Sequence, residues 1–192
     1  MKAADLAGTL AFLRRAEQLK NTLRSAHTSQ GRVESVAEHT WRLCLMAMLF
    51  AKHFPEINFE RLVKMCIVHD LGEAIRGDIP APEQDTSANK ADEERADLLA
   101  LMEPLPTSMQ DEILDLWDAY EAARSPEARL AKALDKLETI LQHNQGQNPA
   151  DFDYRFNLAY GRRYTTDDPL IARIRTILDA ETEARAAASE QA

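Results

Sequence analysis

The sequence predicts an all-α fold in a single domain, for three reasons. The chain has 192 residues, which is the length of one ordinary domain and enough to bury a core without disulfides. Its composition favours helices over strands, because Ala, Leu, Glu and Arg are abundant and there are only 6 Gly and 4 Tyr. Apolar residues recur at three- and four-residue intervals, with neither strand-type alternation nor an internal repeat. We expect one helical domain over residues 1–192, with a core at about 8–180 and a frayed tail at about 181–192.

Two helices separated by a loop are predicted in the N-terminal quarter of the chain. Residues 5–20 place leucines at helical spacing among polar residues. The stretch 23–32 is polar and contains a glycine, so it is predicted to be a loop. Ser35 and Glu38 have the spacing of a capping box, in which each side chain bonds the other residue's backbone amide. A helix from about 36 to 53 is expected to follow and to end at the next proline.

Five further helices are predicted in the rest of the chain. Residues 59–75 carry apolar side chains at the spacing of one helix face and are followed by a loop rich in Gly and Pro. Three more helices are bounded by prolines, at 87–102, 109–123 and 126–145. Residues 151–166 (DFDYRFNLAYGRRYTT) are mixed in character and predict no definite element. The last helix is expected to begin near Pro169, with an aspartate as its N-terminal cap.

Charge and cysteine usage limit the class of protein. A net charge of −9 argues against general binding to nucleic-acid backbones, although a small phosphate ligand remains compatible with it. Cys44 and Cys66 lie in apolar helical stripes, where a thiol behaves as a small hydrophobe, and no disulfide framework is indicated. No signal peptide is evident, and the most apolar stretch, 43–51, is too short to span a bilayer. We therefore expect a cytoplasmic protein without nucleic-acid or membrane partners.

Residues 68–82, VHDLGEAIRGDIPAP, place three acids and a histidine in a segment patterned for burial. His69, Asp70 and Glu73 share a helix face with core residues, at steps of three and four residues. Buried acids are costly unless a cation or hydrogen bonds compensate them. We infer that these three side chains point into the core or into a cleft, and that Asp78 follows on a loop shaped by Gly and Pro.

Two other predicted helices bring similar groups toward the core. His39 begins the core stripe of the 36–53 helix, and Asp135 lies at the edge of the stripe of the 126–145 helix. Taken singly, His39 fits a hydrogen-bonded core residue and Asp135 a solvated or salt-bridged residue. Taken together with the 68–82 segment, they favour a divalent metal such as Mn, Co, Fe, Mg or Zn. Such an ion makes a bound water acidic enough to act as a nucleophile near neutral pH.

The order His39, His69-Asp70, Asp135 in a helical chain resembles the HD-domain phosphohydrolase superfamily, whose signature is H…HD…D. The 5′-deoxynucleotidase branch of that superfamily is similar to three segments, 34–43, 68–82 and 130–142. The resemblance covers most of residues 8–180. It implies a single HD-domain helical bundle that hydrolyses deoxynucleoside 5′-monophosphates to deoxynucleoside and phosphate by attack of a metal-bound water.

The resemblance also implies roles for individual residues. One divalent metal ion is expected to be bound by the four signature residues, His39, His69, Asp70 and Asp135. Glu73 matches a catalytic carboxylate beside the metal. Asp78 matches an acid near the substrate sugar and a metal-bound water, with a catalytic and a substrate-binding role.

One substrate contact departs from the pattern of the bacterial relatives. Arg24 matches an arginine that contacts the substrate phosphate. In the bacterial relatives a tryptophan follows this arginine and helps to select deoxyribose, whereas Ser25 stands here. Members of the branch are commonly dimers, so a homodimer is expected.

Two alternatives remain compatible with the residues. One keeps the metal site but acts on another nucleotide or phosphomonoester, as a phosphatase or phosphodiesterase. The other is a non-catalytic, nucleotide-binding helical module. A phosphodiesterase with two metals normally needs further histidines, and His27, His53 and His143 lack suitable spacing. Trp41 is expected to pack in the core, and Lys136 is expected on a solvated helix face.

Overall fold

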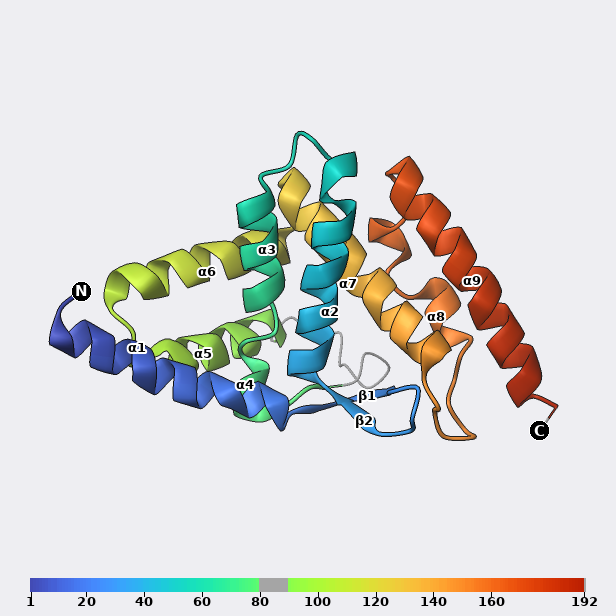
Figure 1. The fold of residues 1–192 in the computed structure, drawn as a ribbon, viewed down its shortest axis with the longest axis horizontal. Coiled ribbons are helices and arrows are strands. Elements are labelled where there is room, and N and C mark those ends of the chain that lie inside the picture. The colour runs from blue at the N-terminus through green and yellow to red at the C-terminus, as the bar shows by residue number, and fades with distance from the viewer. Residues whose placement is uncertain (80–89, 192) are drawn as a thin grey trace.

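The structure, a computed structural model, describes residues 1–79 and 90–191 and is built mainly from α-helices (Figure 1). The helices of two turns or more are α1 (Ala3–Ala16), α2 (Val36–Phe50), α3 (Phe59–Val68), α5 (Lys90–Met102), α6 (Thr107–Ala122), α7 (Pro126–Gln145) and α9 (Pro169–Ser189). The short elements are β1 (Leu23–His27), β2 (Val33–Ser35), α4 (Glu73–Arg76), α8 (Phe156–Ala159) and the 3₁₀ turns Glu17–Lys20, Ala51–His53 and Arg162–Tyr164. The predicted all-α class is confirmed.

Helix α7 lies at the centre of the bundle. Ser125 caps it by accepting a hydrogen bond from the Ala128 amide, and Pro126 occupies the first turn, where its missing N–H costs nothing. Helices α2, α3, α6 and α9 all pack against α7, with α9 on the side away from α2 and α3 (Figure 1). Most of its 20 residues are therefore buried, polar ones included. A charged side chain on α7 that faces α2 or α3 is removed from water.

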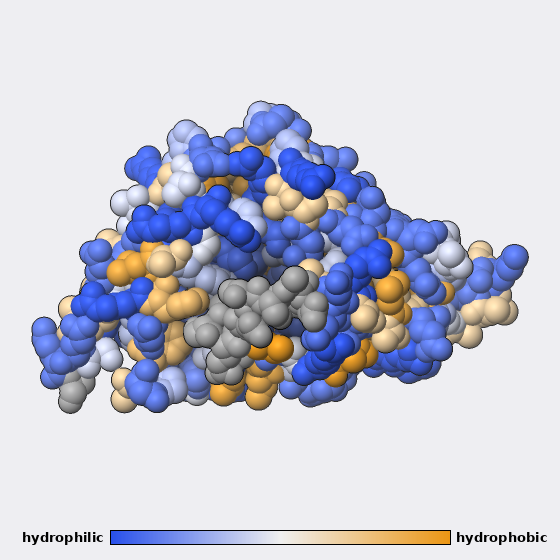
Figure 2. All heavy atoms as spheres, turned by 180° about the vertical axis from the view of Figure 1, so that it is seen from behind, coloured by the Kyte–Doolittle hydropathy of each residue, from blue (hydrophilic) through white to orange (hydrophobic). Residues whose placement is uncertain are grey.

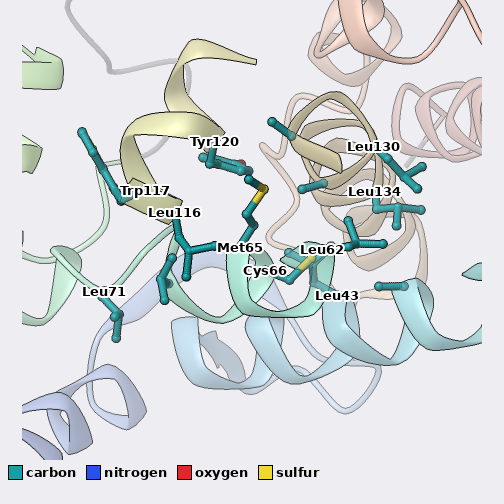
Figure 3. Packing of buried hydrophobic residues seen from close by; sticks show 14 of the residues in the cluster. Leu43, Leu62, Met65, Cys66, Leu71, Leu116, Trp117, Tyr120, Leu130 and Leu134 are labelled. Atoms are coloured by element: carbon teal, nitrogen blue, oxygen red, sulfur yellow. The ribbon is translucent and has the colours of Figure 1, made fainter. Parts of the chain in front are cut away.

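The part of the core shown in Figure 3 joins α3 to α2, α6 and α7. The labelled side chains of this core are Leu43 from α2, Leu62, Met65 and Cys66 from α3, Leu71 from the turn after it, Leu116, Trp117 and Tyr120 from α6, and Leu130 and Leu134 from α7. Burying an aliphatic side chain of this kind contributes about 1.5–3 kcal/mol. The same packing fixes the first turn of α2 and the end of α3, where the candidate site lies. Outside the core, hydrophilic residues cover most of the face shown in Figure 2, consistent with the net charge of −9.

The prediction of a loop at 23–32 holds for residues 28–32 but is wrong for residues 23–27, which form a strand. β1 and β2 form an antiparallel hairpin, in which the Thr28 amide donates to the Arg32 carbonyl at 2.7 Å. Gly31 adopts a φ of 80° in the turn, a conformation that suits glycine. Strands of five and three residues offer too few positions for an alternating pattern to be visible in the sequence. The hairpin carries Arg24 across the face of α7.

The predicted helix at 59–75 is also interrupted. α3 ends at Val68, and the chain forms successive turns up to α4, with the Glu73 amide bonded to the Asp70 carbonyl at 3.1 Å. At Gly72 a Cβ atom would lie 2.9 Å from the Glu94 carbonyl oxygen, so only glycine allows α5 to pack this closely. The Trp117 indole N–H donates to the His69 carbonyl at 3.1 Å and satisfies this end of α3.

The C-terminal boundary differs from the prediction as well. Asp168 caps α9 as expected, but the helix runs to Ser189 and does not fray from about 181. Thr182 and Ala186 are buried on its inner face, and the Thr182 hydroxyl donates to the Asn144 side chain of α7 at 2.9 Å. Packing against α7 therefore holds the end of the helix in place. The described residues contain no helix that is both long and apolar enough to cross a membrane.

Candidate metal centre and cavity

The two predicted histidine ligands lie at helix ends, where local hydrogen bonds set their positions. The capping box at the start of α2 forms as expected, with the Ser35 amide donating to Glu38 at 2.9 Å, and it sets the first turn that carries His39. His39 is fully buried. His69 directly follows α3, and its Nδ1 donates to the Cys66 carbonyl at 2.9 Å. With Nδ1 protonated in this way, the lone pair of His69 lies on Nε2.

The structure brings ligand atoms of His39, His69 and Asp70 within 4.8 Å of one another, and Asp135 lies beside His39. Asp70 Oδ2 lies 3.0 Å from His69 Nε2 and 3.9 Å from His39 Nε2. Asp135 Oδ1 lies 3.3 Å from His39 Nε2. Both Nε2 atoms are buried, and neither makes a well-formed hydrogen bond to a described residue. Unbonded buried imidazole nitrogens surrounded by carboxylate oxygens fit a divalent cation of the borderline or hard type.

Asp135 is held in place from two sides. Its Oδ2 accepts from the Tyr120 hydroxyl at 2.7 Å and lies 2.9 Å from Lys136 Nζ. Burial raises the pKa of Asp135, but the Lys136 ammonium and the neighbouring His39 outweigh it and hold that pKa well below its usual range. The expectation that Lys136 is solvated is wrong, because α7 is packed on this side too and the ammonium turns inward to Asp135.

A second group of charged side chains, which was not predicted from the sequence, surrounds His39. His39 Nδ1 donates to the fully buried carboxylate of Glu138, whose other oxygen accepts from Arg42 Nε at 2.6 Å. Burial and the Arg24 charge lower the pKa of His39, but the carboxylates of Glu138 and Asp135 outweigh them and raise it to about 9. Glu138 stands one helical turn after Asp135, and that spacing could have indicated it.

Arg24 joins the site from the hairpin. Its Nη2 donates to Thr139 Oγ1 on α7 at 3.2 Å, and its Nη1 lies 3.7 Å from Asp70 Oδ2. Glu34, on the neighbouring strand, is also buried, with Oε2 3.5 Å from Arg24 Nε. Burial and the nearby Glu138 charge raise the pKa of Glu34 to about 7. No pattern in the sequence indicates Glu34, because its burial depends on the unpredicted strand.

The remaining predicted site residues line the same cavity. Glu73 begins α4, and its Oε2 is buried with no hydrogen bond to a described residue. Burial and the charges of Asp70 and Asp78 raise the pKa of Glu73 to about 10. Gly77, with a φ of 92°, ends α4 and turns the chain so that Asp78 also lines the cavity. Ser25 lies on the cavity wall as well.

The cavity has a volume of about 610 Å³ and reaches well beyond the candidate metal ligands. One end contains His69, Asp70 and Asp135, with Arg24 beside them. Much of the remaining lining comes from residues 149–164, which lie mainly in the 151–166 segment for which the sequence predicts no element. Among the described residues, the lysine and arginine side chains that line the cavity are Arg24, Lys132, Lys136 and Arg163. The arrangement offers a cation site, basic groups for an anion and space for a larger organic group.

The fold and the cluster of histidines and carboxylates define a member of the HD domain family, to which this chain belongs. A family model described as "HD domain" matches residues 16–175. Among curated proteins, the chain is similar to the 5′-deoxynucleotidase HDDC2 of Homo sapiens, with 32% identity over 189 residues, covering 94% of this chain and 90% of the human protein. It is also similar to the 5′-deoxynucleotidase hdd1 of Schizosaccharomyces pombe, with 36% identity over 148 residues and 74% of each chain covered.

A solved structure has the same fold. A predicted metal-dependent phosphohydrolase from Magnetospirillum magnetotacticum superposes with a TM-score of 0.81 and 26% identity, over 97% of this chain and 95% of that one. The predicted family is therefore confirmed.

Proposed function

We propose that this protein is a metal-dependent 5′-deoxynucleotidase, which hydrolyses deoxynucleoside 5′-monophosphates to a deoxynucleoside and phosphate. The observation that carries the proposal is the pair of unbonded, buried histidine nitrogens beside Asp70, in a cavity that also contains Arg24 and Glu73. The relatives named 5′-deoxynucleotidase support the choice of substrate.

In the proposed mechanism, four residues hold the divalent ion: His39, His69, Asp70 and Asp135. When bound, the metal supplies a Lewis acid that polarises the phosphate and acidifies a water molecule. Arg24 binds the non-bridging phosphate oxygens and offsets their charge. Glu73, whose buried oxygen is unbonded, exchanges a proton with the attacking water or the leaving 5′-oxygen. Asp78 contacts the sugar and orients the same water.

A homodimer is part of the proposal. Trp41 is 65% exposed, so the expectation that it packs in the core is wrong. Together with Met48 and Leu49 it forms an exposed apolar stripe on α2. Contact with a second copy would cover this stripe. The test is the molecular mass of the protein in solution. The wild type should be a dimer and the Trp41→Glu variant a monomer. A monomeric wild type contradicts the proposal.

We further place the protein in the cytoplasm, as a single domain whose partner is the nucleotide substrate. Both cysteines are free thiols, which suits a reducing compartment. Cell fractionation tests the location, and recovery of the protein outside the cytoplasmic fraction contradicts it.

The activity is tested by phosphate release from a panel of deoxy- and ribonucleoside monophosphates and base-free phosphomonoesters, each with Mn, Co, Fe, Mg or Zn. The wild type should prefer deoxynucleoside monophosphates, and Asp70→Ala should lose at least about a hundredfold in kcat/KM, since a metal ligand is removed. Preference for ribonucleotides or base-free esters would favour the other phosphatase alternative. Release from none of them, with no metal bound, would favour a non-catalytic module.

A further inference from the structure

The cavity is larger than a metal ion and a phosphate group require. A phosphate group fills roughly 100–150 Å³ if each heavy atom takes about the 30 Å³ of a liquid water molecule. The cavity has about 610 Å³. Much of the remaining cavity lining comes from residues 149–164, to which the proposed mechanism assigns no role.

This part of the cavity is walled by aromatic rings. The aromatic wall consists of Phe152, Phe156, Tyr160 and Tyr164, all half-buried and all lining the cavity. Phe156 and Tyr160 stand one helical turn apart at α8, with ring centroids 5.4 Å apart and planes tilted by 34°. Phe152 packs at 4.9 Å, edge to face, on the ring of His143 from α7. Four aromatic rings therefore line this part of the cavity, and two of them, Phe156 and Tyr160, contact each other.

The backbone behind the wall is held rigidly by α9. Arg175 is 3% exposed, and its guanidinium donates to the carbonyls of Tyr160 at 2.6 Å, Asn157 at 2.7 Å and Leu158 at 2.9 Å. A buried arginine bonded to three carbonyls fixes an otherwise irregular segment. The aromatic wall is therefore formed before any ligand binds, which lowers the entropic cost of binding.

Lys136 connects the aromatic wall to the candidate metal end. Its ammonium lies 2.9 Å from Asp135 Oδ2 and donates to the Tyr160 hydroxyl at 2.9 Å. One side chain therefore spans the distance between a proposed metal ligand and the wall. In a ligand whose sugar joins a phosphate to a second group, binding of the phosphate at the metal end would bring the second group against Phe156 and Tyr160.

We propose that the aromatic wall, and Phe156 and Tyr160 above all, is the binding site for the nucleobase of the substrate. This inference rests on the proposed function. Every base has an aromatic face that stacks on such rings, whereas a choice between bases requires specific hydrogen-bonding groups. Stacking faces of this kind accept purine and pyrimidine nucleotides alike.

The test compares a nucleotide with the same phosphate lacking its base. We would measure kcat/KM for deoxyadenosine and thymidine 5′-monophosphates and for 2-deoxyribose 5-phosphate, in the wild type, Phe156→Leu, Tyr160→Leu and Phe156→Tyr. The wild type should prefer both nucleotides over the base-free phosphate. Each leucine variant should lower that preference about tenfold, mainly through KM, because a stacking face is lost. Phe156→Tyr keeps the face and should retain the preference.

The matched control is Phe59→Leu, the same substitution at an exposed phenylalanine on α3 outside the cavity, which should behave as the wild type. Circular dichroism establishes which variants fold, and one folded leucine variant is enough for the comparison with the wild type. An unchanged preference in a folded leucine variant overturns the inference while the proposed function stands. A wild type that cleaves no nucleotide overturns both.

Discussion

His39 illustrates how a buried histidine is prepared for a metal ion. Its Nδ1 donates to Glu138, and this bond directs the other ring nitrogen, Nε2, toward Asp70 and Asp135. Arg42 balances the buried charge of Glu138. In metal sites, an outer carboxylate of this kind fixes the orientation of the ring and increases the basicity of the ligand.

We therefore expect Glu138→Gln to weaken metal affinity by about 10–100-fold, because a neutral amide binds the imidazole less strongly. The measurement is a competition titration of the metal between the protein and a chelator. Glu60→Gln, an exposed glutamate paired with Lys64 on α3, is the matched control and should bind metal like the wild type. Equal affinity in Glu138→Gln would show that this carboxylate has no part in metal binding.

The residues that the sequence predicted are those whose position follows from local helix periodicity. His39, Asp70 and Asp135 were identified because each continues or borders the apolar stripe of its own segment. Glu34 and the inward turn of Lys136 could not be found in this way. Their environment comes from contacts with other elements, of Glu34 with Arg24 on the neighbouring strand and of Lys136 with Tyr160.

At the level of elements, the interruption between α3 and α4 shapes the site. It places His69 and Asp70 at the end of one helix and Glu73 at the start of the next. Gly72 makes this possible, because the α5 backbone approaches it too closely for a side chain. The sequence predicted a continuous helix here, since the apolar pattern runs through the turn and only the packing of α5 reveals the break.

Gly72→Ala should lower the free energy of unfolding by about 1–3 kcal/mol, because the new Cβ would meet the Glu94 carbonyl and push α4 and α5 apart. The same displacement should reduce kcat/KM for a deoxynucleoside monophosphate. Denaturant unfolding and phosphate release would be measured together. A variant as stable and as active as the wild type would show that the close contact is unimportant.

Other boundaries at this scale were predictable because their signals are local. The capping box of α2, the start of α7 at Pro126 and the aspartate cap of α9 all form as the sequence predicts. The hairpin and residues 149–164 were not predictable, because pairing partners and a buried arginine from α9 decide their conformation.

At the level of the whole molecule, α7 supplies buried polar groups to both ends of the cavity. One of them, His143, packs beneath the aromatic wall and donates from Nδ1 to the Asn157 side chain at 2.9 Å. Burial lowers the pKa of His143 to about 4, and the bond to Asn157 only partly opposes this effect. His143 is therefore neutral in the folded protein at neutral pH.

This lowered pKa predicts a loss of stability in acid. Above pH 6.5 the histidine is neutral in both states, whereas between about pH 6.5 and 4 the unfolded chain binds a proton that the folded protein does not. The free energy of unfolding should fall by up to about 3 kcal/mol through this window from His143 alone. Denaturant unfolding at a series of pH values should show a shallower fall in His143→Gln. His53→Gln, at an exposed histidine, should keep the wild-type profile, and identical slopes in all three proteins would exclude this role.

The most direct test of the proposed metal site is the position at which a metal ion binds. We would crystallise the protein with Zn²⁺ and locate the ion by anomalous scattering at the zinc edge. We expect one anomalous peak at about 2.0–2.2 Å from nitrogen and oxygen atoms of four residues, His39, His69, Asp70 and Asp135. A peak among Glu34, Glu138 and the Nδ1 side of His39, the other group of possible ligands among the described residues, would contradict it, as would the absence of any peak in the cavity.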